Sequence, residues 1–363
     1  MRHIYSSFFR LIQLMILISF ISGAAIAQPA LLRQSNTLSG SRLNIFTVNS
    51  AGGVLHTASN NAYWSAVNNG LKGINDVQTI AINSNGVVFA GTYGKGVYRS
   101  TNNGAKWIAV NGLKNITINA LVVSGSVIFA GTYDHGVYRS TNNGISWSAV
   151  NDGLRDTRVQ SLVVNNNGDI FAGTDGGVYR SKNNGANWSS VNSGLKSHLI
   201  FALAVNGKGV IFAGTWGAGM FRSTDNGNSW SVINNGLTNL NVRTIIVNGS
   251  GVVFVGTDGG IFRTRADGGV FRSENNGDNW NQINKGLPNV NVLTLAINSH
   301  GVIFAGTYGD GIFRSKNNGD SWNDVNNGLI INYYIWTLAI KKSGLIFAGT
   351  HYGGVYRSTN KLR

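Results

Sequence analysis

Short apolar segments alternate with turns of Gly and Asn along most of the chain. Around Trp107 the segments are rich in β-branched residues and lie at 78–82, 87–92, 96–100 and 107–110. Gly and Asn fill the turns between them, for example at 83–86 and 102–104. This pattern is typical of β-strands joined by tight turns. Because no window combines helical apolar spacing with capping residues, we predict an all-β fold.

The same group of four segments recurs about every 42 residues, a period that falls in the range of propeller repeats. One marker is Phe-Ala-Gly-Thr, which begins at Phe89, Phe129, Phe171, Phe212, Phe304 and Phe347, with Phe-Val-Gly-Thr at Phe254. A second marker ends in Trp, at Trp107, Trp147, Trp188, Trp230, Trp280 and Trp322, and a worn copy spans Thr57–Trp64. Four strands in a repeat of this length indicate the blades of a β-propeller.

The number of blades depends on two incomplete repeats. Residues 44–67 resemble the last three strands of a blade, and residues 335–358 resemble the first three. A ring of seven blades would merge these fragments and leave two strands over. A ring of eight would need two further strands, which Leu31–Leu38 could supply. We favour eight four-stranded antiparallel blades and keep seven as the alternative.

The Trp marker resembles the Asp-box, or BNR repeat, with the pattern Ser-x-Asn/Asp-x-Gly-x-x-Trp. Six copies match, and only Asp225 supplies the acid of the pattern. The resemblance spans roughly residues 44–360, and the wider repeat is also similar to photosystem II assembly-factor-like propellers and to two-component-regulator propeller repeats. It implies that the box is a structural turn between third and fourth strands, with Trp packed between blades. The residues with this implied role are Asn102, Trp107, Asn142, Trp147, Asn183, Trp188, Asp225, Trp230, Asn275, Trp280, Asn317 and Trp322.

The first 27 residues have the pattern of a secretory signal peptide. Arg2 and Arg10 precede or flank the apolar run Leu11–Ser22, and Ala25-Ile26-Ala27 is a cleavage site of the A-x-A type. The run is too short for a typical membrane span, and no later stretch is long and apolar enough. We therefore expect export to the periplasm or the extracellular space, with a lead-in at 28–43 and the propeller over 44–363. A fragment of a larger exported protein is a further interpretation.

The formal net charge is +15, although charged residues make up only 12% of the chain. A basic chain invites an anionic partner. Many arginines, however, recur at one position of the repeat, namely Arg99, Arg139, Arg180, Arg222, Arg314 and Arg357. We therefore assign the charge to the repeat and expect no nucleic-acid partner. Cys is absent, so no disulfide is available.

The turns between the second and third strands vary most within the repeat. In a propeller they share one face, near the central opening, with the connections between blades. Variable turns on a constant frame are where recognition is expected, and exposed aromatics there suit a sugar or a protein partner. A purely structural role, with the rings covering neighbouring turns, stays open. The candidate binding residues are Tyr93, Lys95, Tyr133, Asp134, His135, Trp216, Tyr308, Asp310, His351 and Tyr352.

Catalysis has less support in the sequence. The box invites comparison with sialidases and other glycoside hydrolases, so an enzyme acting on exported polysaccharide is the alternative. Hydrolysis needs two facing carboxylates or their equivalent, yet the single Glu of the chain, Glu274, lies in a box. Asp134, Asp175, Asp258 and Asp310 occupy the variable turns, which leaves an Asp pair open. We name no catalytic residue, metal ligand or cofactor.

One repeat is irregular, because Asp258–Thr264 is followed by the similar segment Asp267–Ser273. An odd insertion within a strand would turn the later side chains to the wrong face. We therefore expect the duplicated segment to loop out as an extra hairpin.

Overall fold

The computed structural model describes residues 46–48, 54–56, 62–258, 268–288, 291–330, 334–359 and Leu362. The chain divides into two units, 1–45 and Phe46–Arg363. The predicted signal peptide, the lead-in and the strands proposed within Leu31–Leu38 lie outside the described residues, as does most of the duplication, at 259–267. Nothing helical in the described part reaches the length and apolarity needed to cross a bilayer.

Seven four-stranded antiparallel sheets form the blades, and each strand position repeats with nearly constant length. The first strands are β4 (Val77–Ile82), β8 (Ile118–Ser124), β12 (Val159–Val164), β16 (Ile200–Val205), β20 (Val242–Val247), β24 (Val292–Ile297) and β28 (Ile335–Ile340). The second strands are β5 (Val88–Thr92), β9 (Val127–Thr132), β13 (Ile170–Thr174), β17 (Ile211–Thr215), β21 (Val253–Thr257), β25 (Ile303–Thr307) and β29 (Ile346–Thr350). The third strands are β6 (Gly96–Ser100), β10 (Val137–Ser140), β14 (Gly177–Ser181), β18 (Met220–Ser223), β22 (Gly269–Ser273), β26 (Ile312–Ser315) and β30 (Gly354–Ser358). The fourth strands are β7 (Ile108–Ala109), β11 (Ser148–Ala149), β15 (Ser189–Ser190), β19 (Ser231–Val232), β23 (Asn281–Gln282), β27 (Asn323–Asp324) and β3 (Trp64–Ala66).

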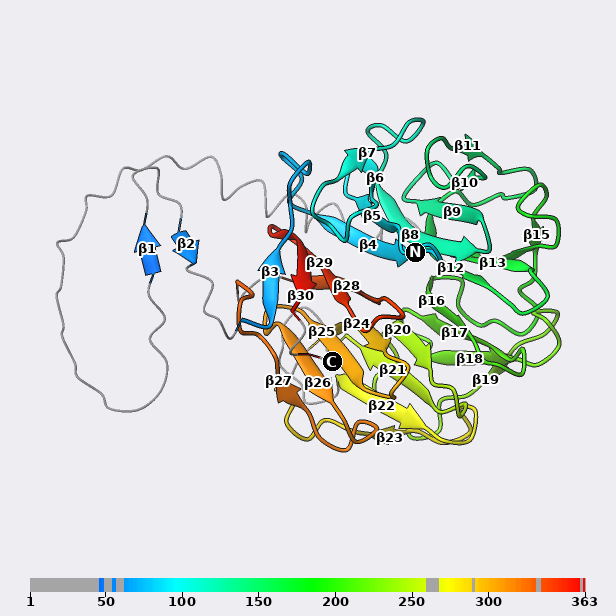
Figure 1. The fold of residues 1–363 in the computed structure, drawn as a ribbon. Helices are drawn as coiled ribbons and strands as arrows, with labels where there is room; N and C mark the ends of the chain where they lie inside the picture. The colour runs from blue at the N-terminus through cyan, green and yellow to red at the C-terminus, as the bar shows by residue number, and fades with distance from the viewer. Residues whose placement is uncertain are drawn as a thin grey trace, which may run out of the picture. The chain divides into compact units, whose positions relative to one another are not determined.

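The ring has seven blades, so the preferred count of eight was wrong and the alternative is correct. Blades 1 to 6 follow chain order from β4–β7 to β24–β27, and blade 7 has the order β28-β29-β30-β3. The first strands lie side by side around the ring, and β28 adjoins β4, which closes it (Figure 1). The two strands left over, β1 (Phe46–Val48) and β2 (Val54–His56), pair with each other. An eighth blade is unnecessary because β3 already completes the blade that the last three strands begin.

The second strand of each blade is buried, apart from the half-buried Val127 at the start of β9, because blades cover both of its faces. All seven carry the Phe-Ala-Gly-Thr or Phe-Val-Gly-Thr sequence, and each Phe is fully buried. Phe89 of blade 1 packs with Ile118, Ile128 and Trp147 of blade 2, so the apolar clusters form between blades. This explains why the strand is a continuous apolar run without the alternation of a one-sided sheet.

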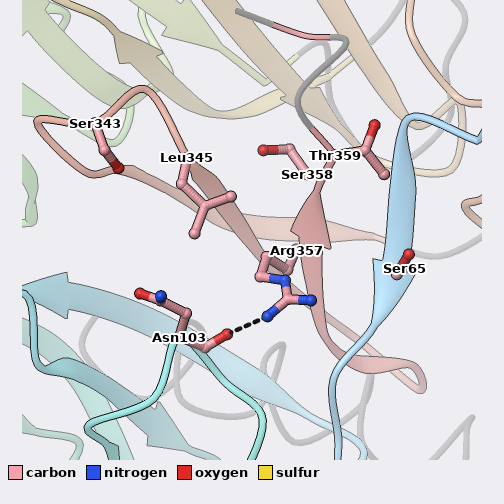
Figure 2. A pocket seen from close by; sticks show the side chains of 7 residues that line it. All are labelled: Ser65, Asn103, Ser343, Leu345, Arg357, Ser358 and Thr359. Atoms are coloured by element: carbon pink, nitrogen blue, oxygen red, sulfur yellow. Dashed lines mark hydrogen bonds between the residues drawn. The ribbon is translucent and has the colours of Figure 1, made fainter.

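The repeated arginines join neighbouring blades. The guanidinium at this position donates to a main-chain carbonyl in the box of the next blade, as in Arg139 to Asn184, Arg180 to Asn226, Arg222 to Asn276 and Arg272 to Asn318. Arg357 of blade 7 makes the same bond to Asn103 O of blade 1 at 2.9 Å, across the closing seam (Figure 2). Five of the repeated arginines therefore connect neighbouring blades among the described residues.

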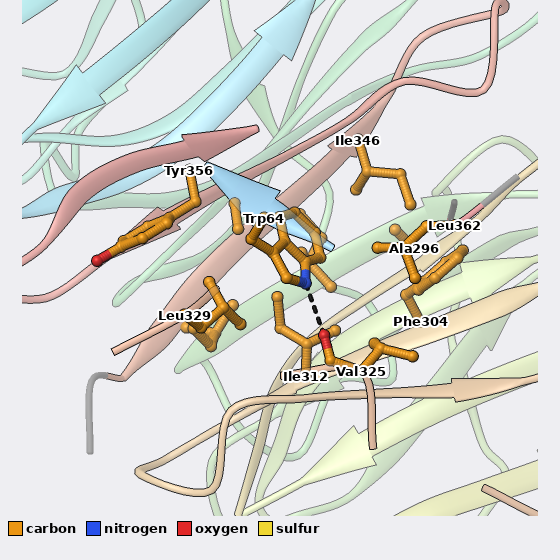
Figure 3. Packing of buried hydrophobic residues seen from close by; sticks show 12 residues of the cluster. Trp64, Ala296, Phe304, Ile312, Val325, Leu329, Ile346, Tyr356 and Leu362 are labelled. Atoms are coloured by element: carbon orange, nitrogen blue, oxygen red, sulfur yellow. Dashed lines mark hydrogen bonds between the residues drawn. The ribbon is translucent and has the colours of Figure 1, made fainter. Parts of the chain in front are cut away.

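Strand β3 closes the ring through both its main chain and its first side chain. It pairs with β30 in the register Trp64↔Ser358 to Ala66↔Tyr356. Trp64 is only 1% exposed and packs against residues of blades 6 and 7, including Phe304 and Tyr356 (Figure 3). Its indole N–H donates to Val325 O at 2.7 Å. The start and the end of the propeller therefore share one core.

Replacing Trp64 with Ala is expected to destabilise the whole ring. The change leaves a cavity between two blades and a buried carbonyl without its donor, so the free energy of unfolding should fall by about 3–5 kcal/mol. Chemical denaturation followed by tryptophan fluorescence measures this value. Ser65→Ala is the control, because Ser65 is exposed in the same strand and its replacement should change stability by less than about 0.5 kcal/mol. Equal stability of both variants would contradict the proposed closure.

Candidate binding face

The turns of the blades separate onto two faces of the ring. Turns between first and second strands contact the boxes of the next blade, as shown by Asn83 Nδ2 donating to Asn143 Oδ1 at 2.6 Å. Turns between second and third strands contact the connections between blades on the other face, where Gly94 N donates to Thr117 Oγ1 at 2.9 Å. We call this second face, which carries all ten candidate binding residues, the mouth.

One hydrogen bond repeated in all seven blades builds the mouth. The first residue of each variable turn donates its main-chain N–H to the carbonyl of the residue before the first strand, at 3.0–3.3 Å. The pairs are Tyr93–Asp76, Tyr133–Thr117, Asp175–Arg158, Trp216–Leu199, Asp258–Asn241, Tyr308–Asn291 and His351–Tyr334. Because this bond uses only main-chain atoms, the side chains at both positions are free to differ between blades.

A bulge adds a third variable side chain per blade. In every blade the register between the first and second strands shifts after the first residue of the first strand. The extra residues are Gln78, Asn119, Gln160, Phe201, Arg243, Leu293 and Trp336. Bulges re-aim a side chain and are frequent near functional sites. This set was not predicted from the sequence, although its signal is present there: one position of an otherwise apolar strand changes chemical type from blade to blade.

Two sectors of the mouth are rich in aromatic side chains. The first, the Trp216 sector, consists of Phe201, Trp216, Arg243 and Asp258. The Arg243 guanidinium lies 5.1 Å from the Phe201 ring and 4.9 Å from the Trp216 ring. Its Nε also bonds to Asp258 Oδ2 at 3.2 Å. The cation and the carboxylate are therefore already engaged with each other and with the rings.

The second, the Tyr352 sector, lies on blades 6 and 7 and reaches Asp76, which precedes blade 1. Its rings are those of Tyr308, Tyr334, Trp336, His351 and Tyr352. Tyr308 and Tyr334 stack with centroids 3.7 Å apart, and the His351 imidazole lies parallel to Tyr334 at 5.3 Å. Trp336 meets Tyr334 and His351 edge-on at 5.9 and 6.1 Å. These are the arrangements that aromatic rings prefer.

Polar groups accompany the rings of the Tyr352 sector. His351 Nδ1 lies 2.6 Å from Asp76 Oδ2, and Gln78 Nε2 donates to Asp76 Oδ1 at 2.5 Å. The buried Trp336 Nε1 has no hydrogen-bond acceptor within the described part of the chain. A buried donor without an acceptor costs about 1–3 kcal/mol. This sector therefore combines ring surfaces, a carboxylate–imidazole pair and an unused donor.

Tyr352 has a main-chain conformation that is unfavourable for its residue type. Its φ is +71°, and every other described non-Gly residue with positive φ is Asn. In three other blades the same turn position is Gly with positive φ, at Gly94, Gly217 and Gly309. A side chain in this region costs about 1–2 kcal/mol. Tyr352 nevertheless keeps its ring there with 53% of its surface exposed.

The other candidate residues are spread around the mouth and are not brought together. Tyr93 is 51% exposed and Lys95 is exposed in the turn of blade 1. Arg158 lies over the Tyr133 ring at 5.3 Å, and the exposed Asp134 and His135 pair with each other. The main-chain N–H of Asp310 bonds to Thr307 Oγ1. Only His351 and Tyr352, with Tyr308 reached through Tyr334, form one cluster.

The carboxylates of the mouth are held by neighbouring groups. Asp175 receives bonds from Arg158 and Gln160, at 3.3 and 2.9 Å. Burial raises the pKa of the nearby Asp156 above its ordinary value, and the negative charge of Asp175 adds to the rise. Among the described residues, no three His, Cys, Asp or Glu side chains gather as a metal site would require.

The boxes lie on the opposite face and make local hydrogen bonds. In blade 1, Gly104 N donates to Ser100 Oγ and Lys106 N donates to Asn102 Oδ1. The residue before the box Gly is an Asn with φ between +55° and +60° in all six copies. Most box tryptophans donate their indole N–H to a carbonyl of the preceding blade, as Trp188 does to Val150; Trp147 instead bonds to Gly144 within its own box.

A pocket of about 440 Å³ opens on the box face at the closing seam. Its lining comes from blade 7, from β3 and from the box of blade 1, and consists of Ser65, Asn103, Ser343, Leu345, Arg357, Ser358 and Thr359 (Figure 2). Its single cation, Arg357, is bonded to Asn103. The pocket marks the place where blade 7 lacks a continuous box, since its third and fourth strands come from opposite ends of the propeller.

The fold and the mouth define a seven-bladed propeller with an irregular, aromatic-rich face. A family model described as the DUF6242 beta propeller domain matches residues 127–242. No curated protein matches the sequence. Among solved structures, YCF48 bound to D1 peptide has 15% identity and a TM-score of 0.65 over 84% of this chain and 99% of that one. This agrees, at the level of fold, with the expected likeness to photosystem II assembly-factor propellers.

Two other solved structures are longer than this chain. The extracellular domain of the putative one component system BT4673 from B. thetaiotaomicron has 18% identity and a TM-score of 0.66, over 82% of this chain and 40% of that one. The GH74 xyloglucanase from Xanthomonas campestris has 18% identity and a TM-score of 0.64, over 81% of this chain and 53% of that one. The chain therefore spans about half or less of these proteins, and the likeness concerns the fold.

The box with Asp225 should make stability depend on pH. Hydrogen bonds from the side chain and main chain of Ser229 hold the pKa of Asp225 below its ordinary value of 3.8. Since the folded-state pKa is depressed, the stabilisation is present above the unfolded value and is lost as pH falls through the folded value. Asp225→Asn should therefore differ from wild type by less than about 1 kcal/mol near neutral pH, because the carboxylate is exposed, and the difference should change below about pH 4.

Denaturant midpoints of both proteins between pH 3 and pH 7 measure this effect. Asn102→Ala is the control, because it removes the same acceptor from a box that holds no carboxylate. Its loss of stability should be the same across the pH range. A difference between Asp225→Asn and wild type that does not change with pH would contradict the prediction.

Proposed function

We propose that this chain is an exported, non-catalytic β-propeller that binds a protein or a glycan through its mouth. The observation that carries the proposal is the main-chain hydrogen bond repeated in all seven blades. Together with the bulge in each first strand, it holds three side-chain positions per blade in constant places, while their chemistry changes around the ring. Such variation on a rigid scaffold is how binding surfaces are built. The signal-peptide pattern of residues 1–27 supports export.

The neighbours in fold are consistent with a binding role. YCF48 is described in complex with a D1 peptide, and BT4673 contributes an extracellular domain. These partners and locations belong to those proteins. For the present chain they support the proposal that a propeller of this type presents one face to a partner outside the cytoplasm, with the boxes acting as structural Asp-box turns on the other face.

The glycoside hydrolase alternative needs two carboxylates that face each other across a bound sugar. In the described part of the mouth, Asp175 is held by Arg158, Asp258 by Arg243 and Asp134 by His135. A carboxylate that is already bonded to a neighbouring side chain is less free to act as the acid or the nucleophile of hydrolysis. This arrangement favours binding over hydrolysis.

Replacing Tyr133, Trp216 and Tyr308 together with Ala should abolish partner binding. The three rings lie on different blades of the mouth. In typical interfaces a few residues, often aromatic, carry most of the binding energy, so their truncation weakens binding strongly. A glycan array and an affinity pull-down with the wild-type propeller identify the ligand, and titration calorimetry then compares the variant with wild type.

The matched control replaces three exposed apolar residues outside the mouth, Ile108, Ile145 and Val232, with Ser. This triple variant should bind as wild type does. If the mouth variant keeps full affinity while remaining folded, the ligand binds elsewhere and the proposed face is wrong.

A further inference from the structure

We infer that the Tyr352 sector is a subsite for an uncharged sugar, with the Tyr352 ring as its stacking platform. The inference rests on the proposed function of the mouth and specifies both the place and the ligand class. Two independent observations carry it: the unfavourable main-chain conformation of an exposed Tyr352, and the buried indole N–H of Trp336 that has no acceptor in the described residues.

The conformation of Tyr352 is explained by a contact that the free protein lacks. At this turn position Gly would cost nothing, and three other blades have it. The Tyr352 ring lies 3.8 Å from the His351 imidazole at a 45° tilt, yet half of its surface faces solvent. Its packing inside the protein is therefore incomplete. Strained residues persist at binding sites because the strain positions a group for the ligand.

The polar groups of the sector match the hydroxyls of a sugar. Asp76, with its oxygens shared between His351 and Gln78, can accept from a hydroxyl. The Trp336 N–H is buried in the free protein, and a shift of this half-buried side chain would let it donate to a second hydroxyl. Such alternation of donors and acceptors beside an aromatic ring suits a pyranose, which has an apolar face and a rim of hydroxyls. Hydrogen bonds of this kind are worth most where the protein group is otherwise unpaired.

The charge of the sector argues against an anionic ligand, since its turns also carry the carboxylate of Asp310 in blade 6. The variable turns and first strands of blades 6 and 7 carry no Arg or Lys. The carboxylate of Asp76 is already paired with His351. In the Trp216 sector, by contrast, Arg243 covers the ring faces of Phe201 and Trp216. The Tyr352 sector thus combines an open ring surface with neutral polar groups.

Titration of the propeller with neutral hexasaccharides of β-1,4-linked glucose, mannose and N-acetylglucosamine tests the inference. Wild type should bind at least one of them. Tyr352→Gly should bind it at least tenfold more weakly while melting at the same or a higher temperature, since Gly relieves the backbone. Trp336→Phe, which keeps a ring and removes the N–H, should also weaken binding severalfold. Ile145→Ser, an exposed residue of a box in blade 2, is the control and should bind as wild type does.

The outcomes separate this inference from the proposed function. Equal affinity of wild type and Tyr352→Gly for the hexasaccharide overturns the inference. So does a wild-type protein that binds none of the sugars but captures a purified protein partner through the mouth, a result that leaves the proposed function intact. Failure of both the sugars and the pull-down would overturn the proposed function as well.

Discussion

The structure depends on one constraint: a four-stranded blade cannot bury its own faces, so each blade must be covered by its neighbours. The fully buried Phe of every second strand shows how complete this mutual burial is, since its ring packs into an apolar cluster that belongs to two blades. Arginine-to-carbonyl bonds between successive blades add a polar connection at the outer part of the same contacts. Because each blade of the closed ring packs against one neighbour on either side, no blade has an uncovered face.

Because these contacts between blades hold the ring together, the side chains of the mouth can differ from blade to blade. The main-chain bond at the start of each variable turn, together with the bulge in each first strand, positions three side chains per blade without constraining what they are. The blades then differ sharply: blade 4 contributes Phe201 and Trp216, whereas blade 3 contributes Gln160 and Asp175. A ring with seven similar positions and unlike side chains provides several distinct local environments on one face, each capable of its own chemistry.

The propeller architecture could be predicted from the sequence because each repeat corresponds to one four-stranded blade. The strand positions and the box turns can be read from the positions of Phe89, Trp107 and their counterparts, whereas the merged blade of residues 64–66 and 335–358 was only part of the seven-blade alternative. The blade count could not be predicted, because the choice depended on whether the two strands before β3 join the ring, and their sequence resembles blade strands. The bulge residues were missed because a bulge depends on pairing across strands, which no single strand reveals. Tyr352 was named as a candidate, but its positive φ is visible only in three dimensions.

Closure by β3 has a consequence for the order of assembly. The strand synthesised first in the ring waits for the three strands synthesised last, so that the Thr359 hydroxyl bonds to Ala62 O across 297 positions of sequence. Such a non-local pairing slows folding, because the chain loses conformational entropy on closing the long loop before the contact stabilises it. Blades 1 to 6 can stack on one another earlier, yet the flanks of blades 1 and 6 stay open to other chains until the final strands arrive. The Tyr352 sector, which lies on blades 6 and 7 and reaches Asp76 before blade 1, is therefore the last part of the mouth to form, because it requires the closed ring.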